Sequence, residues 1–206
     1  MKQGLLFLCV MLLLFSCTES RQESSKSVVP PAPLPLVVLQ PIHSFDTSTL
    51  LFLKASIESA YPVRVKIAQT QPFPQHTYYK PRNRYRADRI IAWLKASCPD
   101  SVRTVVGVTT KDVSSTRNEQ YDYGIMGLGY RPGRACVVSS HRPARTASNR
   151  RHLQERILKL VLHEMGHNFG LPHCADEQCI MVDAEGKMKL DREKGLCASC
   201  RKAVRI

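Results

Sequence analysis

The sequence predicts a mixed α/β (α+β) fold, in which a twisted mixed sheet carries an antiparallel edge strand and has helices packed against it. Three observations predict this fold. Short apolar or alternating runs recur between amphipathic stretches, a pattern typical of strands and helices that share one sheet. A run with several glycines precedes the last long helical stretch and suits an edge strand. Four cysteines crowd the C-terminal end, and the 206 residues are enough for one domain with a substantial core.

Strands are expected where apolar residues run together, or alternate with polar ones, between turn-forming residues. Glycines at 124, 127 and 129 indicate that another group approaches the backbone closely there. Such an edge strand could offer free backbone groups to an extended peptide, and a loop without that role is the alternative. The predicted strands cover residues 36–39, 63–67, 102–108, 125–130 and 135–139.

Three helices are predicted from apolar residues at helical spacing. They cover residues 47–60, 85–97 and a long stretch that ends at 167. Either Ser148 or Asn149 can cap the long helix, because a short polar side chain accepts a hydrogen bond from the first turn. The three prolines between residues 69 and 81 predict a loop.

Residues 1–16 have the form of a signal segment. Lys2 gives it a positive start, and residues 5–15 are almost wholly apolar but too short to span a bilayer. The segment ends in Leu-Phe-Ser-Cys, which resembles a bacterial lipobox. This resemblance implies cleavage before Cys17 and acylation of its thiol. Simple secretion and a short uncleaved anchor are the alternatives.

Residues 17–35 are predicted to form a flexible tether, because they are rich first in Ser, Glu, Gln and Lys and then in proline. A single domain is predicted over residues 36–206. Together these features predict a membrane-anchored lipoprotein of the bacterial cell envelope, facing the periplasm or the exterior. A secreted protein is the alternative.

The formal net charge is +13. The basic residues are spread along the chain, and no nucleic-acid-binding module is recognisable among them. A solvated basic surface therefore explains the charge best. No nucleic-acid partner is expected, the membrane is contacted through the lipid anchor, and the protein is expected to be a monomer.

Residues 163–173 read HEMGHNFGLPH, which has the pattern HExxHxxGxxH. On a helix, His163 and His167 lie one turn apart on the same face and can occupy two corners of a tetrahedral zinc site. Gly170 can adopt the positive φ that turns the chain. His173 then returns as a third ligand, which leaves the fourth position open for water or substrate.

Glu164 stands beside this face, where a carboxylate can take a proton from a zinc-activated water. A single HExxH can occur by chance on a polar helix. Here the additional glycine and third histidine stand where the geometry requires them, which disfavours chance. The motif therefore predicts a zinc-dependent hydrolase with Glu164 as its general base.

Eight cysteines are present, and they need more than one explanation. Four near the C-terminus form a C-x4-C pair and a C-x2-C pair, at Cys174, Cys179, Cys197 and Cys200. Four thiolates complete a tetrahedral zinc site with no open corner, so this site is predicted to be structural. Two disulfides are the alternative, which an exported protein permits. Cys98 and Cys136 could pair with each other or remain free.

The combined pattern, HExxHxxGxxxCx4CxM closed by CxxC, resembles the archaemetzincins, a branch of the metzincin metallopeptidases. The matching residues are His163, Glu164, His167, Gly170, Cys174, Cys179, Met181, Cys197 and Cys200. The resemblance implies a metzincin-like catalytic domain that binds two zinc ions and cuts peptide or protein substrates. It assigns the catalytic zinc to the three histidines, the second zinc to the four cysteines, and the role of general base to Glu164. Met181 would be the methionine of the Met-turn, a hydrophobic floor beneath the metal.

Some features depart from the family pattern. The gap between Met181 and Cys197 is somewhat shorter, and an export signal is unusual for a family associated with the cell interior. Asp183 stands where some metzincins have a tyrosine that stabilises the oxyanion. The resemblance leans toward aminopeptidase action on short peptides.

Two other classes of function compete with a peptidase. One is a non-catalytic, zinc-stabilised module on the cell envelope that binds peptides or proteins. The other is a basic surface protein that binds nucleic acid or anionic lipid. The presence of Glu164 favours the enzyme, because a non-catalytic module has no chemical need for it. His173 and Cys174 are adjacent but would bind different metals, so Cys174→Ser is predicted to weaken the catalytic zinc site as well as the fold.

Overall fold

A computed structural model of the chain describes residues 32–183, 190–204 and 206. Contacts divide the chain into Met1–Ala32 and Pro33–Ile206, and the fold described below is that of the second unit. The predicted signal segment, Cys17 and the tether up to residue 31 lie outside the described residues. Within the described part of the chain, no helix has both the length and the apolar character needed to cross a membrane.

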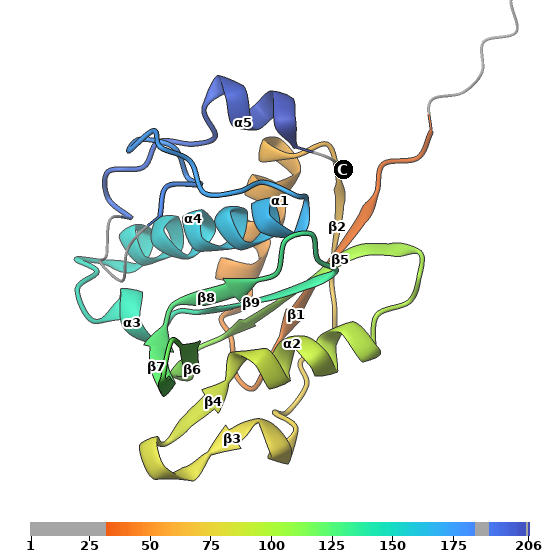
Figure 1. Cartoon of the computed structure of the whole chain (residues 1–206). Helices are drawn as coiled ribbons and strands as arrows, with labels where there is room; N and C mark the ends of the chain where they lie inside the picture. The colour runs from red at the N-terminus through yellow and green to blue at the C-terminus, as the bar shows by residue number, and fades with distance from the viewer. Residues whose placement is uncertain (1–31, 184–189, 205) are drawn as a thin grey trace, which may run out of the picture. The chain divides into compact units, whose positions relative to one another are not determined.

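The main sheet has five strands in the order β2-β1-β5-β9-β8 (Figure 1). Four of them run parallel, and β8 pairs with β9 antiparallel at one edge. The strands are β1 Leu36–Pro41, β2 Arg64–Ile67, β5 Val102–Thr109, β8 Gly127–Gly129 and β9 Ala135–Ser139. This arrangement confirms the predicted fold class, including its antiparallel edge strand.

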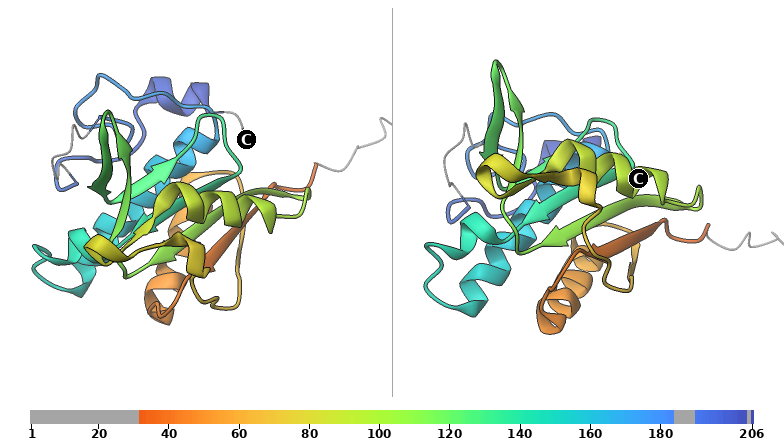
Figure 2. Two further views of the ribbon diagram at one scale, coloured as in Figure 1. Left: turned by 60° about the horizontal axis from the view of Figure 1, so that its bottom comes forward. Right: turned by 90° about the horizontal axis from the view of Figure 1, so that it is seen from below.

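Helices cover both faces of this sheet (Figure 2). α1 (Thr47–Ala60) and α4 (Arg150–Asn168) lie on one face, and α2 (Ala87–Ala96) lies on the other. Alternate residues of β9 divide between two apolar clusters, so that Val138 packs with α1 and α4 while Val137 packs with α2. A strand buried on both sides reads as a continuous apolar run, which is how this strand reads in the sequence.

The helix that carries the HExxH motif begins after Asn149, whose side chain accepts a hydrogen bond from the His152 N–H at 2.9 Å. Asn149 is thus the cap, and Ser148 is not. Asp46 caps α1 in the same way by accepting from the Thr49 N–H at 2.7 Å. Both caps satisfy backbone N–H groups that the first helical turn leaves unpaired.

A second sheet, in the order β3-β4-β6-β7, goes beyond the sequence prediction. Its strands are β3 Tyr78–Tyr79, β4 Arg84–Arg86, β6 Val113–Arg117 and β7 Gln120–Ile125. The prediction of a loop over residues 69–81 is wrong in part, because β3 and two short 3-10 helices lie there. The predicted helix start at residue 85 is also wrong, because Tyr85 pairs with Tyr78 and Val113 in this sheet. The remaining helices are the short α3 His141–Ala144 and α5 Ala198–Ala203.

Candidate active site and metal centres

Three histidines come together at the end of α4. His163 and His167 lie one turn apart on the helix, and Gly170, with φ of 94°, turns the chain back after it. His173 follows this turn, and one nitrogen from each of the three imidazoles lies within 4.8 Å of the others. The structure therefore brings together the three residues that the sequence predicts as ligands.

The histidines are oriented by hydrogen bonds on the side away from their common centre. His163 Nδ1 lies 2.7 Å from the Ile180 carbonyl oxygen, and His167 Nδ1 lies 2.9 Å from that of Leu171. Because a carbonyl only accepts, each Nδ1 carries the hydrogen and each neutral ring has a lone pair on Nε2. The two Nε2 atoms are 3.1 Å apart. Two facing acceptors repel each other unless a cation lies near both, so this geometry fits a metal ion.

Burial keeps these imidazoles in the form that binds metal. It is the main cause that lowers the pKa of His163 to about 4, and it also lowers the pKa of His167. Both side chains are therefore neutral near pH 7, as zinc ligands must be. His173 is more exposed, and its Nδ1 lies 3.4 Å from an Asp183 carboxylate oxygen.

Glu164 is buried between α4 and the edge strand β8. A Cβ on Gly127 would lie 2.6 Å from Glu164 Oε1, and a Cβ on Gly129 would lie 2.6 Å from the Glu164 carbonyl oxygen. Glu164 is thus the group that approaches Gly127 and Gly129, whereas the side chain of Arg142 approaches Gly124. Burial raises the pKa of its carboxyl group to about 8, against a lowering by a hydrogen bond from the Gly129 N–H. A carboxyl group that titrates near neutral pH is suited to exchanging protons.

Met181 is fully buried and packs against α4. Its sulfur contacts the helix at Gly166, between the two histidines of α4. A larger residue than glycine would not leave room for the sulfur. The role of a floor beneath the metal, which the resemblance assigns to Met181, stays a prediction.

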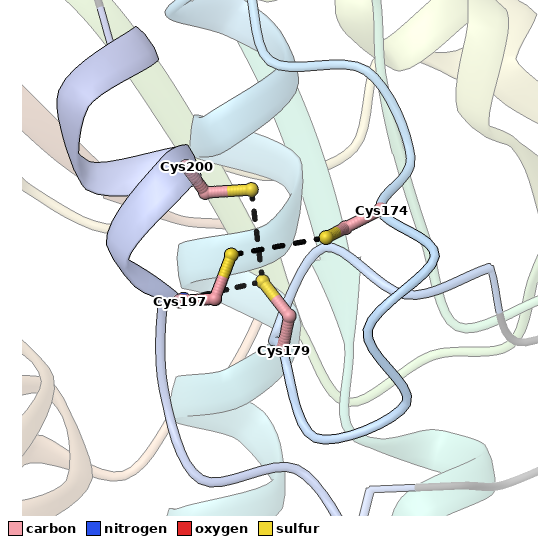
Figure 3. A group of neighbouring side chains, drawn as sticks. All are labelled: Cys174, Cys179, Cys197 and Cys200. Carbon is pink, nitrogen blue, oxygen red and sulfur yellow. Dashed lines mark hydrogen bonds between the residues drawn. The ribbon is translucent and has the colours of Figure 1, made fainter.

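The four C-terminal cysteines form a second cluster (Figure 3). The sulfurs of Cys174 and Cys197 are 3.8 Å apart, and those of Cys179 and Cys200 are 3.7 Å apart. A disulfide needs about 2.05 Å, so the two-disulfide alternative does not describe this structure, in which all four are free thiols. The backbone N–H groups of Met181 and Cys197 both donate to Cys179 Sγ at 3.4 Å, a contact that favours a thiolate there. Four converging sulfurs fit a tetrahedral ion.

Cys98 and Cys136, which the sequence leaves open, are both free in the structure. They therefore do not form a disulfide with each other. Burial raises the pKa of the Cys136 thiol well above its usual range.

Asn168 is a site residue that sequence reasoning misses. It is fully buried, follows His167 directly, and accepts a hydrogen bond from the Thr104 hydroxyl at 2.6 Å. Its Nδ2 donates to the carbonyl oxygens of Tyr130 and Ala135, at 3.1 and 3.2 Å. Asn168 thus joins the end of α4 to the main sheet. The only signal for it in the sequence is a polar residue beside the motif, which is too common to identify its role.

Comparisons with known proteins find related sequences and a related fold. The profile of peptidase family M54 matches residues 58–205. The archaemetzincin of Halobacterium salinarum is 33% identical over 158 residues, which cover 73% of this chain and 88% of that protein. The archaemetzincin of Pyrococcus furiosus is 30% identical over 179 residues, which cover 80% and 90%. The crystal structure of archaemetzincin from Methanopyrus kandleri superimposes with a TM-score of 0.71 at 26% identity, and the match covers 85% of this chain and 96% of that one.

Proposed function

The chain belongs to peptidase family M54 and is a zinc metallopeptidase, and from that premise we propose that His163, His167 and His173 hold the catalytic zinc while Glu164 acts as general base. The observation that carries this proposal is the convergence of two Nε2 lone pairs 3.1 Å apart, with both Nδ1 atoms held by backbone carbonyls. Zinc held there would supply a Lewis acid that lowers the pKa of water and polarises the scissile carbonyl.

Glu164 would move the proton that the reaction requires. Its carboxylate takes the proton from the attacking water and passes it to the leaving amine. A zinc ion bound beside Glu164 would favour the carboxylate, which is the form that can accept this proton. The contact with β8 keeps the carboxylate at one place relative to a peptide that lies along that strand.

The edge strand β8 would hold the substrate. No strand pairs with its outer edge within the described part of the chain, so an extended peptide can add there through backbone hydrogen bonds. Cleavage of short peptides next to a free N-terminus is the finer expectation, and substrates with free and acetylated N-termini would test it.

The four cysteines would hold a second, structural zinc. Their sulfurs surround one point and leave no open corner for a substrate. The C-terminal segment has few bulky apolar residues, so a metal would supply folding energy that packing does not.

We also propose that the protein is anchored in the cell envelope by an acylated Cys17, with the tether as spacer. The support is the lipobox-like sequence before Cys17. Expression in a bacterial host with labelled palmitate tests this proposal. Label in the membrane fraction, lost in Cys17→Ser, is expected, and unlabelled protein in the soluble fraction would contradict it.

One experiment tests the catalytic proposal. The zinc content of the purified domain is measured first, and hydrolysis of a diverse peptide library is then compared between wild type and Glu164→Gln. We expect two zinc ions per chain in both proteins and hydrolysis only in the wild type. Retained hydrolysis in Glu164→Gln would rule out Glu164 as the base. Two zinc ions without hydrolysis by the wild type would favour the non-catalytic binding module.

A further inference from the structure

Arg131 lies on the short segment between β8 and β9, and this segment is fixed to the end of α4 at the residue that follows His167. Asn168 donates from Nδ2 to the Tyr130 carbonyl oxygen at 3.1 Å, and its own carbonyl oxygen accepts from the Gly133 N–H at 3.2 Å. Both hydrogen bonds are made by Asn168, the residue that follows His167. Arg131 is thus held between two residues, Tyr130 and Gly133, that are anchored next to the histidine cluster.

β8 ends two residues before Arg131. Within the strand, Gly127 and Gly129 face Glu164, whereas Leu128 packs in the cluster around α2 on the opposite face. Residues 131 and 132 then form a bend, and both flanks of this bend are bonded to Asn168. Arg131 therefore lies where the edge of the sheet that carries Glu164 meets the end of α4.

The charge of Arg131 has no carboxylate partner within the described residues. Its side chain is exposed, and it forms no ion pair there. The nearby Arg134, by contrast, is paired with Asp100 at 2.9 Å. An exposed, unpaired guanidinium beside a substrate strand is available for an anionic group on the substrate.

We propose that Arg131 determines specificity, and that the enzyme prefers peptides with an acidic side chain on the N-terminal side of the scissile bond. This inference rests on the proposed binding of peptides along β8. Antiparallel addition is the more stable pairing, and it places the N-terminal part of the peptide beside the C-terminal end of β8. That end leads directly into Arg131.

Kinetic measurements on matched peptides test the preference. The peptides are internally quenched, known to be cut at one bond, and differ only by Glu, Gln or Lys immediately before that bond. For the wild type we expect kcat/KM to be about 3- to 5-fold higher for Glu than for Gln, the size typical of a partly exposed ion pair. This Glu-to-Gln ratio should fall to about 1 in Arg131→Gln. In Arg131→Glu, kcat/KM should be highest for the Lys peptide. Equal rates for all three peptides in the wild type would overturn the proposal.

A binding measurement separates this proposal from the proposed chemistry. Fluorescence anisotropy with the same peptide sequences, labelled, and zinc-loaded Glu164→Gln requires no turnover. We expect the Glu peptide to bind about 3- to 5-fold more tightly than the Gln peptide, with the difference lost when Arg131→Gln is added. Arg64→Gln, on the opposite edge strand β2, is the matched control and should keep the difference. If Glu164→Gln binds the peptides selectively but the wild type does not hydrolyse them, only the catalytic proposal is contradicted. Absent or unselective binding would overturn the role of Arg131.

Discussion

Met181 packs directly on Gly166, so that a Cβ at residue 166 would lie 2.4 Å from the Met181 sulfur. Gly166→Ala would ordinarily stabilise an exposed helix by about 1 kcal/mol. Here the added methyl group must displace a fully buried side chain, and overpacking of this kind costs about 1–3 kcal/mol. We therefore expect a lower free energy of unfolding, together with weaker binding of the catalytic zinc. Urea unfolding and zinc competition with a chelator measure these two effects.

The double variant Gly166→Ala/Met181→Ala serves as the control. If the clash causes the loss, shortening the methionine relieves it, and the two substitutions will not be additive. Additive losses would show that Gly166 matters for a reason unrelated to Met181.

Substitution of Gly127 and Gly129 should damage the enzyme in different ways. Alanine at 127 meets the end of the Glu164 side chain, which can move, whereas alanine at 129 meets the Glu164 carbonyl oxygen, which cannot move without the helix. We expect Gly127→Ala to keep its stability and lose about 100-fold in kcat, because a shift of about 1 Å in a catalytic group has that effect. Gly129→Ala should instead be destabilised by about 2 kcal/mol. Full activity in Gly127→Ala would contradict the proposed role of the Glu164 carboxylate.

Local sequence patterns predict much of this fold and site, because the chemistry of the histidine and cysteine motifs depends on short spacings. The limits of α1 and the parallel strands follow from apolar runs that are buried in the main sheet. The hairpin of β6 and β7 could not be predicted in this way. Asp112, immediately before β6, forms ion pairs with Arg84 at 2.8 Å and with Arg142 at 2.9 Å. These contacts connect the start of the hairpin to β4 and α3. Apolar periodicity does not reveal charged contacts between residues that are distant in the sequence.

Residues that act through tertiary contacts are also hidden in the sequence. Asn168 joins α4 to strands that are far away in the chain, and the contact between Asp183 and His173 depends on a turn. The glycines of β8 show that something approaches closely, but only the fold identifies that group as Glu164.

Glu193 should make the protein less stable at high pH. Burial raises the pKa of its carboxyl group to about 7 from an ordinary 4.5, with Lys159 opposing and Asp191 adding to the shift. A raised carboxyl pKa means that ionisation costs more in the folded state. The stabilising contribution of the protonated Glu193 carboxyl group is therefore complete below about pH 4.5 and is lost as the pH rises through 7. In metal-free protein, Glu193→Gln should match the wild type at pH 4 and exceed its free energy of unfolding by about 2 kcal/mol at pH 8.

Urea unfolding at both pH values measures this difference. Glu155→Gln, an exposed glutamate paired with Arg151 on the surface of α4, is the control and should change stability by less than about 0.5 kcal/mol. A constant difference between Glu193→Gln and the wild type from pH 4 to pH 8 would contradict the prediction.

The two metal sites should be coupled through the adjacent residues His173 and Cys174. The Cys174 N–H donates to the Met181 carbonyl oxygen at 2.8 Å, so this residue also connects the cysteine cluster to Met181, which packs on α4 at Gly166. We expect Cys174→Ser to lose the structural zinc, to lower stability, and to weaken the catalytic site about 10-fold, as displaced supporting groups do at zinc sites. Chelator competition resolves the two affinities.

Cys200→Ser, on α5, removes a ligand from the same cluster. It separates the effect of displacing Cys174 from the effect of losing the structural zinc. If only the position of Cys174 matters, the histidine site will bind zinc more tightly in Cys200→Ser than in Cys174→Ser. Equal losses of affinity would mean that the structural zinc itself supports the catalytic site. Unchanged affinity in Cys174→Ser would show that the two sites are independent.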